Sequence, residues 1–166
     1  MKDFILDYKY SFGYIAAIVI ANIGFTYLPM IALPGGEMLA PMSFLVGFIF
    51  VLRDFSQREI GHRVLAAMAV GGLLSYFMAD PFVAYASVVA FIISELVDWA
   101  VYTFTKRPLK QRILFSSIVG TPIDSAVFML LLGFFSWYGL IAMVVSKMVG
   151  AVIVWYLMAD DNEVFI

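Results

Sequence analysis

Six long apolar runs divide this chain of 166 residues, and short polar or turn-forming segments separate them. A helix that crosses the hydrocarbon core of a bilayer needs about 20 mostly apolar residues. We therefore expect an all-α polytopic membrane protein, with six transmembrane helices in a single transmembrane domain over residues 1–166. The runs are Phe12–Leu28, Leu39–Leu52, Val64–Met78, Pro81–Thr103, Ile113–Phe135 and Tyr138–Met158. The second and third are short, so we expect them to extend into flanking polar residues or to reach the membrane interface early.

The composition agrees with a lipid environment. Hydrophobic residues make up 64% of the chain and charged residues 13%, whereas a soluble domain is about half apolar and about a quarter charged. The lipid bilayer is therefore an expected partner. The absence of cysteine excludes disulfides, thiolate metal sites and cysteine nucleophiles. We expect no cofactor, no metal centre, no catalytic residue and no nucleic-acid partner, and a further copy of the chain is a candidate partner.

Nine of the ten basic residues fall before the first run or in two of the connections. These residues are Lys2, Lys9, Arg53, Arg58, Arg63, Lys106, Arg107, Lys110 and Arg112. The connections around Gly35, Asp80 and Trp137 contain neither lysine nor arginine. Because Lys and Arg concentrate in cytoplasmic loops, this distribution predicts both termini in the cytoplasm of a bacterial inner membrane. The first run has no small-residue cleavage site after it, so we expect it to be retained in the protein.

Ionisable residues interrupt the last three runs. Glu95 and Asp98 lie in the fourth, Asp124 in the fifth, and Lys147 in the middle of the sixth. A charge at the centre of a transmembrane helix costs about 2.5–3.5 kcal/mol on insertion scales. At 1.5 Å of rise per residue these groups reach similar depths, as does Asn22 in the first run. Such residues persist when they pair, face water or bind a substrate, so we expect a central polar cavity.

The helical faces support this cavity. Ser87, Phe91, Ser94, Asp98 and Tyr102 share a side of the fourth run with Glu95, and Ser117, Thr121, Asp124 and Phe128 share a side of the fifth. Pro122 frees a backbone carbonyl on the fifth run. A structural alternative is a buried Lys147–Asp124 tie between two helices with no solute. Asp54 is close enough to the apolar core to gate the cavity, although pairing with Arg58 on a helix end is the simpler interpretation.

The polar residues of the second half resemble those of the queuosine-precursor transporter family, first called the putative vitamin uptake transporters. The residues that carry the resemblance are Ser94-Glu95-Leu96-Val97-Asp98, Arg112, Ser116, Asp124-Ser125-Ala126-Val127-Phe128 and Lys147. Asn22, and Asp54 with Gly61 seven residues later, also fit the family pattern. The chain departs from that pattern at Val46-Gly47, where a Phe-Pro pair is usual, and at Arg58, where an acidic residue is common.

The resemblance implies import of a 7-deazaguanine such as 7-cyano-7-deazaguanine, a small purine-like solute. The implied site comprises Asn22, Asp54, Glu95, Asp98, Asp124 and Lys147. A carboxylate can accept the paired N–H donors of a guanine-like edge, and Lys147 or Asn22 would suit its oxygen. Phe91, Trp99 or Phe128 could stack on the flat face. Without a nucleotide-binding loop in the sequence, the driving energy would come from a gradient or from a partner.

Two other functions remain open at this stage. The chain could be the substrate-binding subunit of an energy-coupling-factor importer, with Ala17 and Ala21 as a small-residue docking stripe. From a different class, Asp98 and Asp124 could form the dyad of an intramembrane aspartyl protease. The sequence lacks the Gly-rich flanks of such proteases, and Lys147 would have no role in one. Uptake by the chain expressed alone would distinguish a transporter from both.

Overall fold

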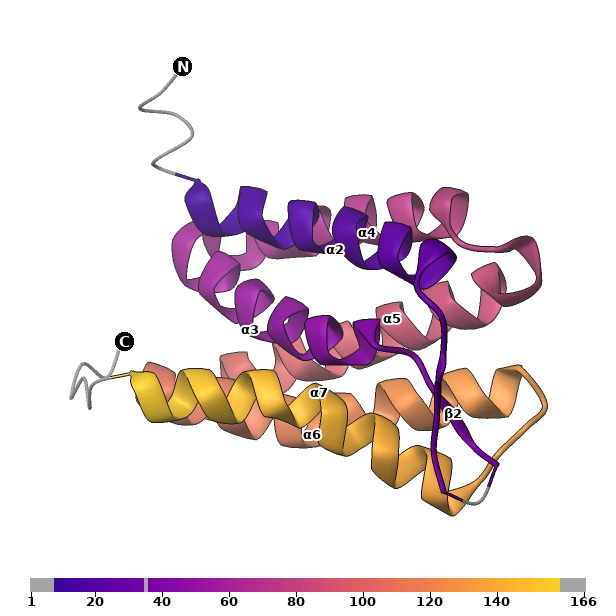
Figure 1. The fold of residues 1–166 in the computed structure, drawn as a ribbon. Helices are drawn as coiled ribbons and strands as arrows, with labels where there is room; N and C mark the ends of the chain where they lie inside the picture. Colours follow the sequence, from indigo (N-terminus) through magenta and orange to yellow (C-terminus); the bar gives the residue numbers. More distant parts are fainter. Residues whose placement is uncertain (1–7, 35, 159–166) are drawn as a thin grey trace.

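A computed structural model describes residues 8–34 and 36–158, and these form six α-helices joined by short connections (Figure 1). Lys2 and both chain termini lie outside the described residues. The helices are α2 (Lys9–Tyr27), α3 (Met42–Ile60), α4 (Val64–Met78), α5 (Pro81–Phe104), α6 (Leu109–Leu131) and α7 (Trp137–Leu157). A 3-10 turn, η1 (Gly61–Arg63), joins α3 to α4, and a two-stranded hairpin, β1 (Ile31–Ala32) with β2 (Met38–Leu39), joins α2 to α3.

The all-α membrane fold is confirmed at the level of helix length and composition. Within the described residues, five helical stretches are long and apolar enough to cross a membrane, and Met42–Met78 counts as one of them. That stretch contains α3 and α4, which reverse direction at η1, where Gly61 has a φ of +61°. Successive helices run in opposite directions, so the start of α2 and the end of α7 lie at the same end of the bundle (Figure 1).

The observed helices match the expected runs to within a few residues, except for the second. That run extends into the flanking polar residues, as expected from its shortness, and continues as α3 to Ile60, because neither glycine nor proline lies between Leu52 and Gly61. The expectation that Arg53 lies in a connecting loop is therefore wrong. Arg53 and Asp54 lie inside α3, and Arg58 lies in its last turn. The third run does not extend, and α4 has 15 residues.

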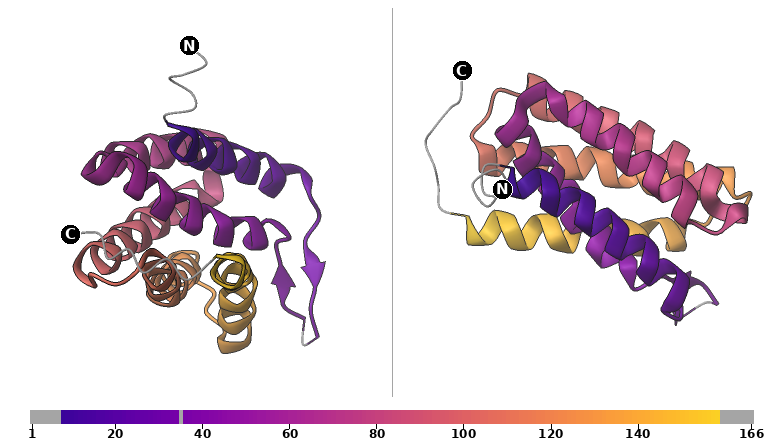
Figure 2. Two further views of the ribbon diagram at one scale, coloured as in Figure 1. Left: turned by 90° about the vertical axis from the view of Figure 1, so that its left-hand side faces the viewer. Right: turned by 90° about the horizontal axis from the view of Figure 1, so that it is seen from above.

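Helix α3 lies at the centre of the bundle and contacts each of the other five α-helices. Helices α2 and α4 pack on one side of it and α6 and α7 on the other, with α5 between α4 and α6 (Figure 2). The buried apolar residues form two clusters. One joins α2, α3 and α4 around Tyr14, Ile18 and Met68. The other joins α3, α5, α6 and α7 around Tyr102 and Ile113.

Small residues allow the closest helix contacts. A Cβ atom at Gly47 of α3 would overlap the carbonyl oxygen of Lys147 on α7. A Cβ atom at Gly150 would come within 2.8 Å of the backbone nitrogen of Phe48. Between α2 and α4, a Cβ atom at Gly71 would lie 2.6 Å from Ile18 Cδ1. Backbone-to-backbone approach of this kind is typical of membrane helices.

Large apolar side chains cover much of the outside of the bundle. Exposed examples on four of the helices are Ile20, Leu73, Leu130, Val145 and Ile153. An exterior of this chemistry would be unstable in water over so large an area, whereas lipid tails solvate it. Polar and charged side chains concentrate instead in the interior, which is the reverse of a soluble protein.

Candidate functional site

A cavity of about 540 Å³ extends into the bundle from the end that carries the β-hairpin and the α4–α5 connection. Met30 and Met38 of the hairpin region and Asp80 lie at its outer end, and Glu95 and Lys147 lie at its inner end. Its polar lining comprises Asn22, Thr26, Ser43, Ser75, Asp80, Ser87, Glu95, Asp124 and Lys147. A cavity of this size, mostly apolar with a few converging polar groups, is typical of a small-molecule site.

Lys147 and Asp124 form an ion pair beside this cavity. The Lys147 ammonium lies 2.5 Å from Asp124 Oδ2 and donates to the Ser125 hydroxyl at 2.9 Å. The Ser94 hydroxyl lies 3.2 Å from Asp124 Oδ1 and can donate to it. The Lys147 side chain is 3% exposed and that of Asp124 is 14% exposed. The ion pair that the sequence suggested is thus present. The bonds to Asp124 and Ser125 use two of the three N–H donors of Lys147, which leaves the third for another acceptor.

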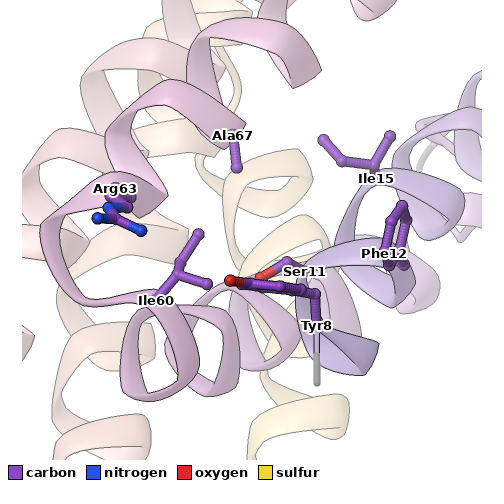
Figure 3. Close-up of a pocket in the computed structure, with 7 residues that line it drawn as sticks. All are labelled: Tyr8, Ser11, Phe12, Ile15, Ile60, Arg63 and Ala67. Atoms are coloured by element: carbon purple, nitrogen blue, oxygen red, sulfur yellow. The ribbon is translucent and has the colours of Figure 1, made fainter. Parts of the chain in front are cut away.

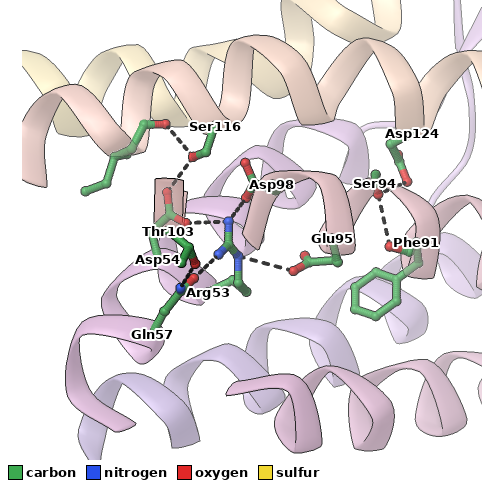
Figure 4. Close-up of polar contacts among 11 residues, drawn as sticks. Arg53, Asp54, Gln57, Phe91, Ser94, Glu95, Asp98, Thr103, Ser116 and Asp124 are labelled. Carbon is green, nitrogen blue, oxygen red and sulfur yellow. Dashed lines mark hydrogen bonds and ion pairs between the residues drawn. The ribbon is translucent and has the colours of Figure 1, made fainter. Parts of the chain in front are cut away.

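A second polar cluster, with its charged side chains fully buried, surrounds Arg53, and we call it the Arg53 cluster (Figure 4). It comprises Arg53, Asp54, Gln57, Glu95, Asp98, Thr103 and Ser116. The guanidinium forms ion pairs with Asp54 at 2.5 Å, with Glu95 at 3.4 Å, and with Asp98. Three carboxylates from two helices therefore share one cation.

Neutral side chains complete the Arg53 cluster. Gln57 Oε1 accepts from Arg53 Nη1 at 2.5 Å, and Gln57 Nε2 donates to the Thr103 hydroxyl at 2.8 Å. The Ser116 hydroxyl donates to Asp54 Oδ2 at 2.7 Å. These bonds tie α3 to α5 and α6. Asp54 is therefore engaged by Arg53 and Ser116.

Glu95 belongs to both regions. It lines the cavity, and its Oε2 atom also lies 3.4 Å from Arg53 Nε (Figure 4). Among the described residues neither of its carboxylate oxygens has a hydrogen-bond partner, although the side chain is fully buried. A buried carboxylate without donors is costly, so this position is suited to accept N–H or O–H groups from a bound molecule.

The remaining site candidates divide between cavity and core. Phe91 and Phe128 line the cavity. Trp99 is not among the lining residues; it packs against the α2–α3–α4 cluster, with edge contacts to His62 and Phe104. Its depth explains this, because Trp99 is one turn beyond Glu95, near the level of η1. Asp54 and Asp98 likewise lie in the Arg53 cluster and do not line the cavity.

Asn22 lines the cavity, but its amide N–H groups are already used. Asn22 Nδ2 donates to the Ile18 carbonyl at 2.8 Å and to the Ser75 hydroxyl at 3.1 Å. These bonds leave the side-chain oxygen as the group that can accept from a bound molecule. Of the two residues expected to donate to a solute oxygen, Lys147 and Asn22, Lys147 is therefore the better suited.

Arg53 is the residue that sequence reasoning missed, because the second run was ended too early. A signal was present in the sequence. Arg53 and Asp54 follow the apolar stretch directly, and the next residue able to end a helix is Gly61. Extending the helix to that glycine would have placed both charges in the bundle.

A smaller cavity of about 280 Å³ lies at the opposite end, between the start of α2 and the α3–α4 junction (Figure 3). Its lining is mainly apolar, with Tyr8, Ser11 and Arg63 as the polar members. The Ser11 hydroxyl is within hydrogen-bond distance of Ser56 and of Glu59, and Glu59 also accepts from the backbone N–H groups of Tyr10 and Ser11. These bonds anchor the start of α2, and this cavity contains none of the buried charges.

Comparisons with known proteins identify the family. The family model described as "Putative vitamin uptake transporter" matches residues 10–159, which is most of the chain. No curated protein and no solved structure matches the chain.

Proposed function

The chain belongs to the Putative vitamin uptake transporter family, and we propose that it imports a 7-deazaguanine, a queuosine precursor such as 7-cyano-7-deazaguanine. Family membership makes it a membrane transporter of a solute. The finer assignment of the solute rests on the chemistry of the large cavity together with the resemblance described above.

The observation that carries the proposal is the Glu95 carboxylate at the inner end of the cavity. It is fully buried, and within the described structure its oxygens lack hydrogen-bond donors. The guanine-like edge of a 7-deazaguanine presents adjacent N–H donors, which a carboxylate can accept as a pair. Binding would therefore supply hydrogen bonds to a carboxylate that has only its ion pair with Arg53 among the contacts described above.

The other cavity residues complement the rest of this solute. Lys147 has an N–H donor beyond those bound to Asp124 and Ser125, and this donor suits the exocyclic oxygen. The rings of Phe91 and Phe128 line the same cavity and offer apolar faces to a flat bicyclic molecule. The Asn22 oxygen is a further acceptor.

We propose six membrane spans, with both termini in the cytoplasm of a bacterial inner membrane and one domain over residues 1–166. The alternating helix directions support an even number of crossings, since α2 begins and α7 ends at one end of the bundle (Figure 1). The basic residues Arg58, Lys106 and Arg107 lie at this end, which supports a cytoplasmic location. Helix α4 would cross as a short helix of 15 residues.

The two rival functions find less support. Ala17 and Ala21, the suggested docking stripe of an importer subunit, are buried in the bundle at 7% and 3% exposure. Asp98 and Asp124 are paired with different cations, Arg53 and Lys147, whereas an aspartyl protease dyad shares a proton between adjacent carboxyls.

The test is uptake of labelled 7-cyano-7-deazaguanine by cells that cannot make it and that express the chain alone. Glu95→Gln replaces one acceptor oxygen by a donor that opposes the solute's own N–H groups. We expect a loss of about 1–3 kcal/mol, which is about 5- to 150-fold in apparent affinity. Glu37→Gln, the same change in the hairpin, should leave uptake unchanged. Normal uptake by Glu95→Gln at parental membrane levels would refute the proposed site.

A further inference from the structure

The buried charges of the bundle do not balance. The Arg53 cluster contains Asp54, Glu95 and Asp98 against the single guanidinium, and all four side chains are fully buried. The Asp124–Lys147 pair is balanced by itself and supplies no spare cation. With all three carboxyls ionised the cluster carries a net charge of −2, which is costly in a low-dielectric interior, so binding of one positive charge is favoured there.

Unpartnered oxygen atoms identify where that charge would bind. In the described part of the chain, Glu95 Oε1 and Asp98 Oδ1 have no hydrogen-bond partner. Glu95 and Asp98 are three residues apart and share a side of α5. Because the Arg53 contacts use Oε2 of Glu95 and Oδ2 of Asp98, the other oxygen of each carboxyl is left without a donor.

The geometry favours a proton over a metal ion. A metal ion needs several oxygens around an open space, and the described residues contain no group of three or more His, Cys, Asp or Glu side chains arranged to hold one. The centre of the cluster is filled by the Arg53 guanidinium. A proton requires only one carboxyl oxygen and no additional volume.

We propose that Asp98 is the proton-binding residue of the transporter, that protons reach it from the cavity through Glu95, and that this proton couples import to the proton gradient. This inference rests on the proposed function. In one cycle, a proton from outside water binds the Glu95 carboxylate and passes to Asp98, which restores the Glu95 carboxylate. Solute donors then bind Glu95. Release to the cytoplasm returns one proton and one solute molecule to water and leaves both carboxylates ionised.

Titratable and charged groups of α2, α3, α5, α6 and α7 face this site. From α3 these are Arg53 and Asp54, and from α5 itself Glu95 and Tyr102. From α6, Asp124 lies within electrostatic range of Glu95, and Arg112 lies over the Tyr102 ring at 5.3 Å. Tyr14 of α2 lies within electrostatic range of Glu95 and Asp98. Lys147 of α7 neutralises Asp124.

These neighbours restrict the coupling group to one residue. Asp124 is paired with Lys147, and Asp54 accepts a hydrogen bond from Ser116 in addition to its ion pair with Arg53. Glu95 lines the cavity and is needed as an acceptor for the solute. Asp54 and Asp98 both lie beyond the cavity, but Asp54 Oδ1 pairs with Arg53 and its Oδ2 accepts from Ser116, whereas Asp98 Oδ1 has neither an ion-pair contact nor a hydrogen bond among the described residues.

The experiment uses purified protein in liposomes with equal potassium on both sides and valinomycin, so that the membrane potential is zero. With the inside one pH unit more alkaline, one proton per solute supports accumulation of labelled 7-cyano-7-deazaguanine up to about tenfold, since one unit is worth about 1.4 kcal/mol. External solute should also cause alkalinisation of the outer medium, and a protonophore should abolish accumulation. A sodium gradient should have no effect.

The Asp98→Asn variant separates binding from coupling, because its neutral amide has the charge of a protonated carboxyl. We expect it to exchange internal for external solute within about twofold of the parent, with no accumulation and no proton movement. Asp98→Glu should restore pH-driven accumulation. Glu37→Gln serves as the matched control and should behave as the parent.

The outcomes are distinct. Exchange by the parent without proton movement, or accumulation driven by sodium, would overturn the proton site while leaving the proposed function intact. Coupling that persists in Asp98→Asn would overturn the assignment to Asp98. A parent protein that neither exchanges nor accumulates the labelled solute would refute both proposals.

Discussion

The Asp124–Lys147 pair makes a quantitative prediction about stability. The two groups lie 2.5 Å apart on α6 and α7, with Ser94 and Ser125 as their hydrogen-bond partners. Asp124→Asn leaves the Lys147 charge without its counter-ion, and Lys147→Met does the same to Asp124. Breaking a buried pair costs about 3–5 kcal/mol, and we take the lower end, about 3 kcal/mol, because Asp124 retains 14% exposure.

The Asp124→Asn/Lys147→Met double variant should lose much less stability than the sum of the losses of the two single variants. With both charges removed, no buried charge is left unpaired, and the cost falls to the lost hydrogen bonds, at about 1 kcal/mol each. We therefore expect the free energy of unfolding to fall by about 2 kcal/mol in the double variant, against about 6 kcal/mol if the two single effects were additive. At about 2–4 °C per kcal/mol for a chain of this size, each single variant should lower the melting temperature by about 6–12 °C.

The assay is thermal unfolding of the purified protein in one detergent at fixed pH and salt. Asp124→Asn combined with Glu37→Gln is the control, since Glu37 belongs to the hairpin and these two effects should add. If the melting temperature of the Asp124→Asn/Lys147→Met protein fell by the sum of the single effects, the two charges would not be coupled, and the geometry described here would be refuted.

Four further predictions follow from the packing and the site. Gly47→Ala should destabilise the protein by at least about 1–3 kcal/mol, because the added methyl group overlaps the Lys147 carbonyl oxygen. Gly13→Ala is the control in the same unfolding assay, since the nearest atom to its methyl group would be 3.8 Å away. Arg53→Gln should leave the three carboxylates without their cation and lower the yield of folded protein in size-exclusion chromatography far more than Arg58→Gln. Phe91→Ala should weaken solute binding by about 0.5–1.5 kcal/mol more than the loss of buried apolar area alone would cost, whereas Trp99→Phe should leave binding unchanged. Equal effects of the two variants in a titration with 7-cyano-7-deazaguanine would contradict the cavity lining. A reporter fused after Ile166 should be active only as a cytoplasmic form, and periplasmic activity would refute the six-span topology.

Much of this fold could be predicted from apolar run lengths, because the bilayer sets how long a spanning helix must be. The third run was predicted to the residue, and the fourth began where expected, at Pro81 after Asp80. Depth along the helix was sufficient to bring Asp124 to Lys147.

The Arg53 cluster could not be predicted in this way. A count of apolar residues treats a charge as the end of a span, and Arg53 follows the apolar stretch of the second run directly. Whether that charge lies in a loop or in the bundle depends on its partners Glu95 and Asp98 of α5, and the rotation of α5 about its own axis is a property of the packed state. The same limit applies to Trp99, whose depth and not its position on the helical face excludes it from the cavity.

The central position of α3 has a consequence for membrane insertion during synthesis. This helix carries Arg53 and Asp54, and the other partners of Arg53, Glu95 and Asp98, are synthesised about 40 residues later, or about 2–8 s later at about 5–20 residues per second. Until α5 arrives, α3 carries an arginine that costs about 2.5–3.5 kcal/mol at the bilayer centre. We therefore expect α3 to integrate late, together with α5, so that a nascent chain released after α4 would hold α2 in the bilayer more securely than α3.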